Sequence, residues 1–136
     1  MFEHVNELAV FVAAILSVAV GSIWYSPLLF GKPWMRSAGL TVEDEELSTK
    51  EAMVVTVKGV LVQAVFFFVV AEFISVSQTA LIPLTTLGVA LATLLVSYMV
   101  SVVVWEGKSF TYLFIHAGYG TLALLGGIGV IAFWPW

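Results

Sequence analysis

Four long apolar runs, separated by short polar segments, make up most of the 136-residue chain. The runs cover about residues 6–28, 52–77, 83–105 and 109–134. Each run is long enough, as a helix, to cross the roughly 30 Å hydrocarbon core of a bilayer. We therefore predict an all-α integral membrane protein, a four-transmembrane-helix bundle with short loops, in which residues 1–136 form a single transmembrane domain.

The first run ends in the stretch Trp24–Arg36, where aromatic rings, prolines and the first basic residues occur together. Aromatic side chains favour the membrane–water boundary, and Lys and Arg favour its cytoplasmic side. Ser48 and Glu51 have the spacing of a capping box, which is typical of a helix start. We therefore expect Trp34 and Met35 to belong to an interfacial loop segment that the second membrane helix follows.

The basic residues lie in two of the connecting segments or, for Lys58, near the start of the apolar run that follows the first of them. The five are Lys32, Arg36, Lys50, Lys58 and Lys108. Because short cytoplasmic loops carry an excess of Lys and Arg, we expect loops 29–51 and 105–109 to be cytoplasmic and both termini to lie outside. Labelling of single engineered cysteines from the two sides of the membrane would test this topology.

The composition agrees with a membrane protein, since 61% of the residues are hydrophobic and 10% are charged, against about 25% charged in soluble domains. The net charge of −4 comes largely from the polar loop, which includes the acidic run Glu43–Glu46. We interpret this run as a solvated face, because adjacent carboxylates lack the spaced ligands of a calcium loop.

The expected partner is the lipid bilayer, and nucleic acid is not expected. The chain has no cysteine, which excludes disulfides and thiolate chemistry.

Small residues recur at helical spacing in the first and last runs and predict close helix packing. The candidates are Ser17, Gly21, Gly120, Ala123 and Gly127. The third run has a similar stripe of small and hydroxyl-bearing residues, formed by Thr86, Ala90, Thr93, Ser97 and Ser101. At 100° per residue each set falls on one face of its helix.

Three stretches resemble the family known as domain of unknown function 1761, small bacterial and archaeal membrane proteins. They are Trp24–Met35 with the following Gly39-Leu40-Thr41, the turn Trp105–Ser109, and Gly118-Tyr119. The resemblance implies a four-span fold in the cytoplasmic (inner) membrane of a prokaryote, and no established activity. His116 occupies a site where the family often has another polar residue, so the resemblance implies no role for it.

Polar side chains from all four runs fall at similar depths in the cytoplasmic half of the predicted bundle. They are His116, Tyr112, Ser97, Ser101, Gln63, Thr56, Tyr25 and Trp24. An ionisable residue inside the membrane is a functional candidate by default, and His titrates near neutrality. This layer could therefore bind a small polar solute or relay a proton in a transporter or channel. Four helices enclose little space, so such a pathway predicts a homo-oligomer.

Two other interpretations remain open. His116 can simply hydrogen-bond across a helix pair, which contributes about 1 kcal/mol to helix association. The whole chain can also be a structural or accessory subunit that binds other membrane proteins. A polar-lined cavity that reaches His116 favours transport, whereas large apolar outer faces around a dry interior favour the accessory role.

The sequence offers little support for an enzyme, a metal site or a cofactor. Glu3, His4 and Glu7 are close enough to share a divalent cation, with Glu72 at the same predicted depth, but carboxylates are also favoured at a helix N-terminus. We therefore prefer a solvated terminus and expect no metal. No nucleophile with a base, paired catalytic carboxylates or phosphate-binding loop is found, so we expect neither catalysis nor a cofactor.

Overall fold

The computed structural model describes residues 5–40 and 49–135, and these ranges form helices without any strand. The helices are α1 (Glu7–Trp24), α2 (Gly31–Ala38), α3 (Thr49–Thr79), α4 (Leu84–Glu106) and α5 (Phe110–Ala132). Among the described residues, four helices, all except α2, are long and apolar enough to cross a membrane. This confirms the all-α membrane fold with four spans. The predicted interfacial segment contains the short helix α2, whereas Glu43–Glu46 and the capping residue Ser48 lie outside the described residues.

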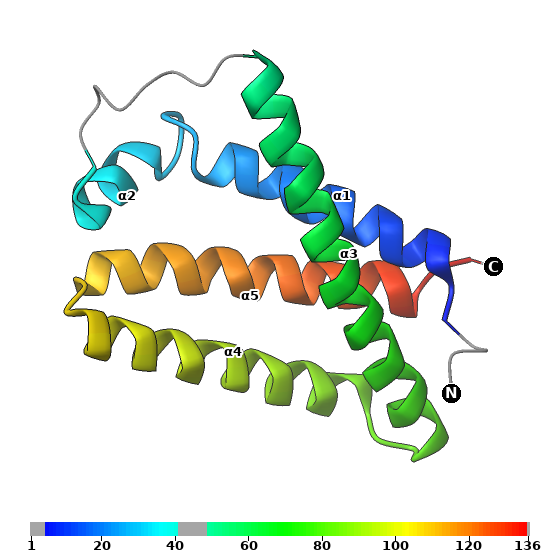
Figure 1. The fold of residues 1–136 in the computed structure, drawn as a ribbon. Helices are drawn as coiled ribbons and strands as arrows, with labels where there is room; N and C mark the ends of the chain where they lie inside the picture. Colours follow the sequence, from blue (N-terminus) through cyan, green and yellow to red (C-terminus); the bar gives the residue numbers. More distant parts are fainter. Residues whose placement is uncertain (1–4, 41–48, 136) are drawn as a thin grey trace.

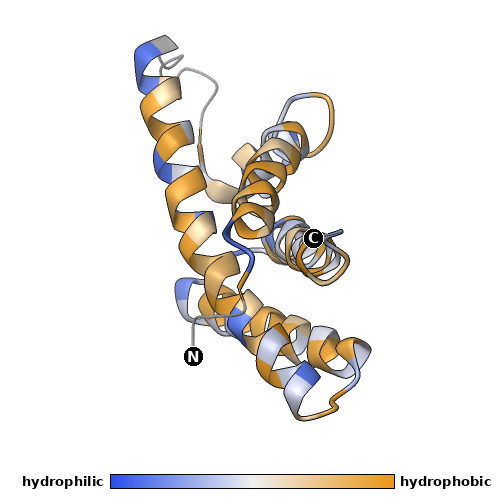
Figure 2. Cartoon of the chain, turned by 90° about the vertical axis from the view of Figure 1, so that its right-hand side faces the viewer, coloured by the Kyte–Doolittle hydropathy of each residue, from blue (hydrophilic) through white to orange (hydrophobic). Residues whose placement is uncertain are grey.

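The long helices do not all run side by side. α5 lies between α1 and α4, and α3 crosses this row steeply and packs mainly against α1 (Figures 1 and 2). With 31 residues, α3 is about 46 Å long at 1.5 Å per residue, which is longer than the roughly 30 Å hydrocarbon core of a bilayer. The arrangement is therefore a row of three helices with a crossing helix, and it departs from a bundle of four near-parallel helices.

The two ends of the molecule differ in the helices and basic residues that lie there. α2 and the α4–α5 turn lie at one end, and the start of α1 and the end of α5 lie toward the other (Figure 1). Lys32, Arg36 and Lys108 therefore lie together at the end with α2 and the α4–α5 turn. Which side of the membrane each end faces stays a prediction.

The core is formed where α1, α3 and α5 meet. Its buried side chains are Val10, Ala13, Ala14, Phe67, Val70, Ala71, Ile74, Leu124 and Ile128. The alanines of α1 let the backbone of α3 approach closely, and Phe67 fills the centre with none of its surface exposed. A Cβ atom at Gly127 would overlap the Phe67 ring. Gly127 is therefore the point at which α5 makes room for the largest buried side chain.

The other predicted packing residues also lie at helix contacts or within the bundle. Ser17 is buried in α1, and a Cβ atom at Gly21 would lie 3.0 Å from the Tyr119 hydroxyl. A Cβ atom at Gly120 would lie 3.1 Å from side-chain atoms of α4. Ala123 is partly buried on α5. The small residues thus mark the contacts of α1 and α5, the two helices on which they were found in the sequence.

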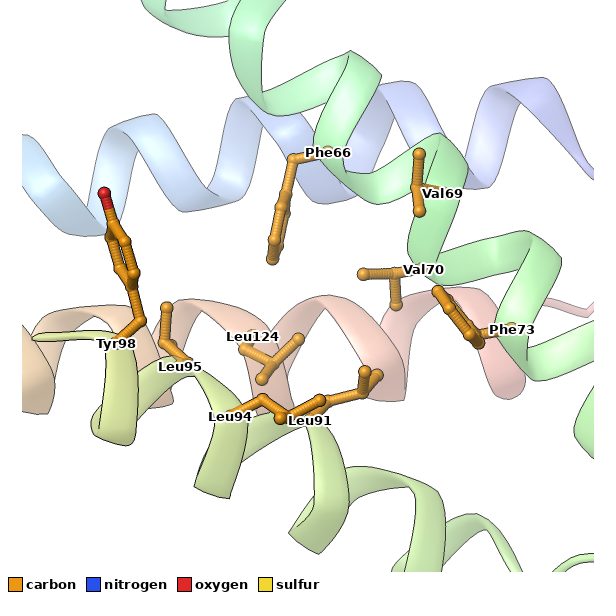
Figure 3. A pocket seen from close by; sticks show the side chains of 9 residues that line it. All are labelled: Phe66, Val69, Val70, Phe73, Leu91, Leu94, Leu95, Tyr98 and Leu124. Atoms are coloured by element: carbon orange, nitrogen blue, oxygen red, sulfur yellow. The ribbon is translucent and has the colours of Figure 1, made fainter.

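The outer surface of the four long helices is largely apolar, as expected for a lipid-facing surface (Figure 2). Where α3 diverges from α4, an apolar cavity of about 310 Å³ remains between them, over Leu124 of α5 (Figure 3). Phe66 and Phe73 line it from α3, and Leu91 and Leu94 line it from α4. Nearly all of its wall is hydrocarbon, and among the lining side chains only Tyr98 has a polar atom, its hydroxyl group.

Candidate functional site

His116 lies in the first half of α5, where α5 meets the end of α1 and the returning helix α2. Its Nδ1 atom is 2.6 Å from the Tyr25 hydroxyl oxygen. The indole Nε1 of Trp34 donates a hydrogen bond of 3.2 Å to its Nε2 atom. Both ring nitrogens of the only described histidine are therefore engaged by aromatic side chains from two other segments.

These two bonds select one form of the imidazole. An indole N–H can only donate, so Nε2 must carry a lone pair and the ring proton must sit on Nδ1. The Nδ1–H then donates to the Tyr25 oxygen, and the hydroxyl hydrogen of Tyr25 is not used in this bond. Burial, together with the neighbouring phenols of Tyr119 and Tyr112, raises the pKa of the Tyr25 hydroxyl, which follows the last residue of α1, above its usual value. Tyr25 therefore stays a neutral phenol.

The turn between α1 and α2 brings Trp34 back to His116. The Gly31 N–H donates to the Ser26 carbonyl oxygen (2.9 Å), and the Phe30 N–H donates to the Trp24 carbonyl oxygen (3.0 Å). A Cβ atom at Gly31 would lie 2.5 Å from the Tyr25 carbonyl oxygen. The chain can therefore reverse this tightly only because residue 31 has no side chain.

Trp24 and Tyr119 attach α1 to α5 on either side of His116. The Trp24 indole donates to the Ile115 carbonyl oxygen (3.0 Å), and Gly118 leaves space for the Trp24 ring, since a Cβ atom there would lie 3.1 Å from it. The Tyr119 hydroxyl donates to the Ser17 carbonyl oxygen (3.1 Å). These bonds hold the helix pair in one register, which places His116 opposite Tyr25.

The aromatic rings around His116 form a continuous cluster. The Tyr112 ring lies edge to face with the imidazole at 4.4 Å between centroids. Tyr25 makes similar edge contacts with Trp34 (5.3 Å) and Tyr119 (5.4 Å). Such contacts orient each ring and leave few alternative rotamers. We call Tyr25, Trp34, Tyr112, His116 and Tyr119 the His116 cluster.

Two cavities flank the His116 cluster. The α1–α3 cavity, of about 500 Å³, has polar lining residues Ser22, Tyr25, Thr56, Lys58, Gln63 and Tyr119. The α4–α5 cavity, of about 260 Å³, is lined by Tyr98, Met99, Val102, Val103, Glu106, Tyr112, Leu113 and His116. Tyr25 belongs to the wall of the first and His116 to the wall of the second. The hydrogen bond between these two side chains therefore connects the linings of the two cavities.

The structure brings some of the predicted site residues together and separates others. Trp24, Tyr25 and Tyr112 surround His116, and Gln63 lies in the α1–α3 cavity with Tyr25 and Thr56. Ser97 and Ser101 are exposed on the outer face of α4 and do not reach the cluster.

The weak metal candidates are not assembled in the described part of the chain. Glu3 and His4 lie outside the described residues, and Glu7 begins α1 at the end of the molecule away from α2 (Figure 1). Glu72 is partly buried on α3, where its Oε1 atom has no hydrogen-bond partner. Within the described ranges, no group of three His, Cys, Asp or Glu residues is close enough to hold a metal ion.

Sequence reasoning missed three residues of this region: Trp34, Tyr119 and Glu106. Trp34 was assigned to the interface alone, although its indole must find an acceptor once it is buried. Tyr119 is three residues after His116, which places it on the same side of α5. Glu106 belongs to the loop 105–109, and nothing in the sequence distinguishes it from an ordinary solvated charge. For Tyr119 the helical spacing was a usable signal, whereas the return of Trp34 depends on a tertiary turn.

The fold and the site define the class: an all-α membrane protein with four spans and a hydrogen-bonded His–Tyr–Trp cluster at one end. A family model described as protein of unknown function (DUF1761) matches residues 8–132, nearly the whole chain, and the protein therefore belongs to this family. This confirms the family resemblance seen in the sequence. Comparisons with curated proteins and with solved structures find no match.

Proposed function

We propose that this protein is a proton-responsive membrane transporter that binds a solute, and that the His116 cluster is its functional site. The hydrogen bond between Tyr25 and His116 (2.6 Å) carries the proposal, because it connects side chains that line two different cavities. An ionisable side chain in a membrane-spanning helix is costly and is usually retained for function. Here His116 lines one cavity and is hydrogen-bonded to Tyr25, which lines the other.

The bond from Trp34 provides the response to protons. A protonated imidazole carries hydrogen on both nitrogens, so its Nε2–H would face the indole N–H of Trp34 and the bond between them would be lost. Trp34 and α2 would then move away from His116. Neutral His116 thus favours the docked position of α2, and charged His116 favours its release.

The groups around His116 can influence this change. Tyr25 and Trp34 face it from the end of α1 and from α2, Tyr112 contacts it edge to face from the same helix, and Glu106 of α4 lines the same cavity. The Lys108 ammonium lies 5.7 Å from the centroid of the Tyr112 ring. Glu106 is the group that would stabilise a charged imidazole, so the carboxylate favours the released state.

Proton flux into liposomes tests the proposal. Purified protein is reconstituted, a pH gradient is imposed, and acidification is followed with an enclosed dye. We expect His116→Ala to lower the flux to that of protein-free liposomes, because the hydrogen bond between the linings of the two cavities is lost. Ser101→Ala is the matched control, since Ser101 is exposed on α4 away from the cluster, and it should behave as wild type. Equal flux in wild type and His116→Ala would remove His116 from the mechanism.

A second candidate function, an accessory subunit that binds other membrane helices or its own copy, is favoured by the outer face of α4. All five residues of its small and hydroxyl-bearing stripe, Thr86, Ala90, Thr93, Ser97 and Ser101, are exposed. Small residues allow helix backbones to approach closely in lipid, and hydroxyls add bonds across the contact. A second copy packed here would give the homo-oligomer that the transport proposal also requires.

Cysteine cross-linking tests this contact, because the chain has no cysteine of its own. Ser97→Cys should form a disulfide-linked dimer in oxidised membranes if two copies meet along the stripe. Phe114→Cys is the control, since Phe114 is also exposed, at 74%, but lies on α5. Equal cross-linking at both positions, or none at Ser97→Cys, would contradict a homodimer through α4.

A further inference from the structure

The α4–α5 cavity contains one acidic group in a mainly aromatic and aliphatic wall. Glu106 is the last residue of α4, and Tyr98, Met99 and Tyr112 line the cavity beside it. No basic side chain is among its lining residues in the described chain. Within the same described ranges, no hydrogen bond or ion pair satisfies the Glu106 carboxylate. Glu106 is therefore the charged residue of the lining, and its carboxylate attracts a cation, whereas the Lys108 ammonium lies outside the lining and interacts with the Tyr112 ring.

The metal-binding alternative fails on the available ligands. Both nitrogens of His116 are already occupied, Nδ1 by Tyr25 and Nε2 by Trp34. A metal ion would therefore find one carboxylate and the thioether of Met99. Zinc sites use at least three protein ligands, and calcium takes six to eight oxygen ligands. The cavity has neither the three protein ligands that zinc needs nor the oxygen ligands that calcium needs.

The remaining chemistry is that of an organic cation. The faces of tyrosine rings attract ammonium groups, and quaternary ammonium ligands are recognised by aromatic walls in this way. The Tyr112 ring already has an ammonium near it, since Lys108 Nζ lies 5.7 Å from its centroid. Val102, Val103 and Leu113 provide apolar surface for methyl groups. A volume of about 260 Å³ admits a small ligand of this kind.

We infer that the α4–α5 cavity binds a small organic monocation of the quaternary or tertiary ammonium class, held by the Glu106 carboxylate and the rings of Tyr98 and Tyr112. Both Glu106 and Tyr98 are exposed, so the ligand enters from the surface of α4 near the membrane boundary. The α1–α3 cavity has the opposite character, because Lys58 is its charged lining residue. The inference goes beyond the proposed function, since cation binding does not require transport.

Choline and its uncharged analogue 3,3-dimethyl-1-butanol provide the test, since they have similar shapes and differ in charge. Binding is measured by calorimetric titration of the full chain in detergent at neutral pH. We expect choline to bind at least about tenfold more tightly than the alcohol, as expected for cation–aromatic and carboxylate attraction in a partly desolvated site. Glu106→Gln should weaken choline binding severalfold and leave binding of the alcohol unchanged, and Tyr98→Leu should also weaken choline binding severalfold.

Glu7→Gln is the matched control, because it removes one carboxylate from the far end of the molecule, and it should bind choline as wild type does. Glu106 and Tyr98 are both exposed, so their variants should keep the helical circular dichroism of wild type. Equal binding of choline and the alcohol, or unchanged choline binding in Glu106→Gln, would overturn the inference. Proton flux without choline binding would refute the cation site alone, and choline binding without flux would refute the transport proposal alone.

Discussion

Gly127→Ala is expected to destabilise the protein by about 1–3 kcal/mol, the usual cost of forcing an extra group into a packed core. The new Cβ atom would overlap the ring of Phe67, which has no exposed surface and lies between three helices. Neither α3 nor α5 can move apart without opening the core. Thermal unfolding in detergent, followed by circular dichroism, should show a fall of several degrees in the midpoint.

The neighbouring glycine provides the control. A Cβ atom at Gly126 would meet nothing within 4 Å, and Ala is favoured over Gly in a helix by up to about 1 kcal/mol. Gly126→Ala should therefore be neutral or slightly stabilising. Phe67→Leu should partly rescue Gly127→Ala, because the smaller side chain releases the space that the methyl group needs. Equal midpoints for the two alanine variants would contradict the close packing of Phe67 against Gly127.

Gly31→Ala is expected to release α2 from the rest of the protein while the four long helices remain. Its Cβ atom would lie 2.5 Å from the Tyr25 carbonyl oxygen and 2.7 Å from the Ser26 carbonyl carbon and oxygen. These are backbone atoms, so the turn itself must open, and Trp34 then loses its bond to His116. Hydrogen exchange should show faster exchange of the α2 amides, with those of α1 and α5 little changed.

Lys32→Ala is the comparison for this variant, because Lys32 is the next residue of α2 and its side chain is exposed. It should leave the exchange of α2 as in wild type. Gly31→Ala should also lower proton flux as His116→Ala does, since both variants break the His116 cluster. Slow exchange of α2 in Gly31→Ala would show that the turn tolerates a side chain and that the position of Trp34 does not depend on Gly31.

The sequence predicts the depth at which most residues of the candidate site lie. It does not predict which residues at that depth belong to the site. His116, Tyr25, Tyr112 and Trp24 were expected to lie at one depth, and the structure brings them together. Depth follows from counting residues along each helix, which is a one-dimensional property. Ser97 and Ser101 have the same depth but point outward from α4, because depth says nothing about which side of a helix meets its neighbours.

The amino-acid sequence by itself determined the all-α membrane class and the presence of four spans, and it predicted that Lys32, Arg36 and Lys108 share one end of the molecule. Hydrophobic length and the residues at each boundary are local signals, and the bilayer acts on each span separately. The small residues of α1 and α5 also predicted close helix contacts, because few other side chains permit them.

The tertiary structure alone decided the crossing of α3, the outward face of α4 and the return of Trp34 to His116. Lipid is as apolar as the side chains of the helices, so hydrophobic patterning cannot say which faces pack together. The position of α2 depends on backbone bonds around Gly31 that form only when the turn is closed. Shape complementarity at a few glycines, such as Gly127 against Phe67, then selects one packing from many that are equally apolar.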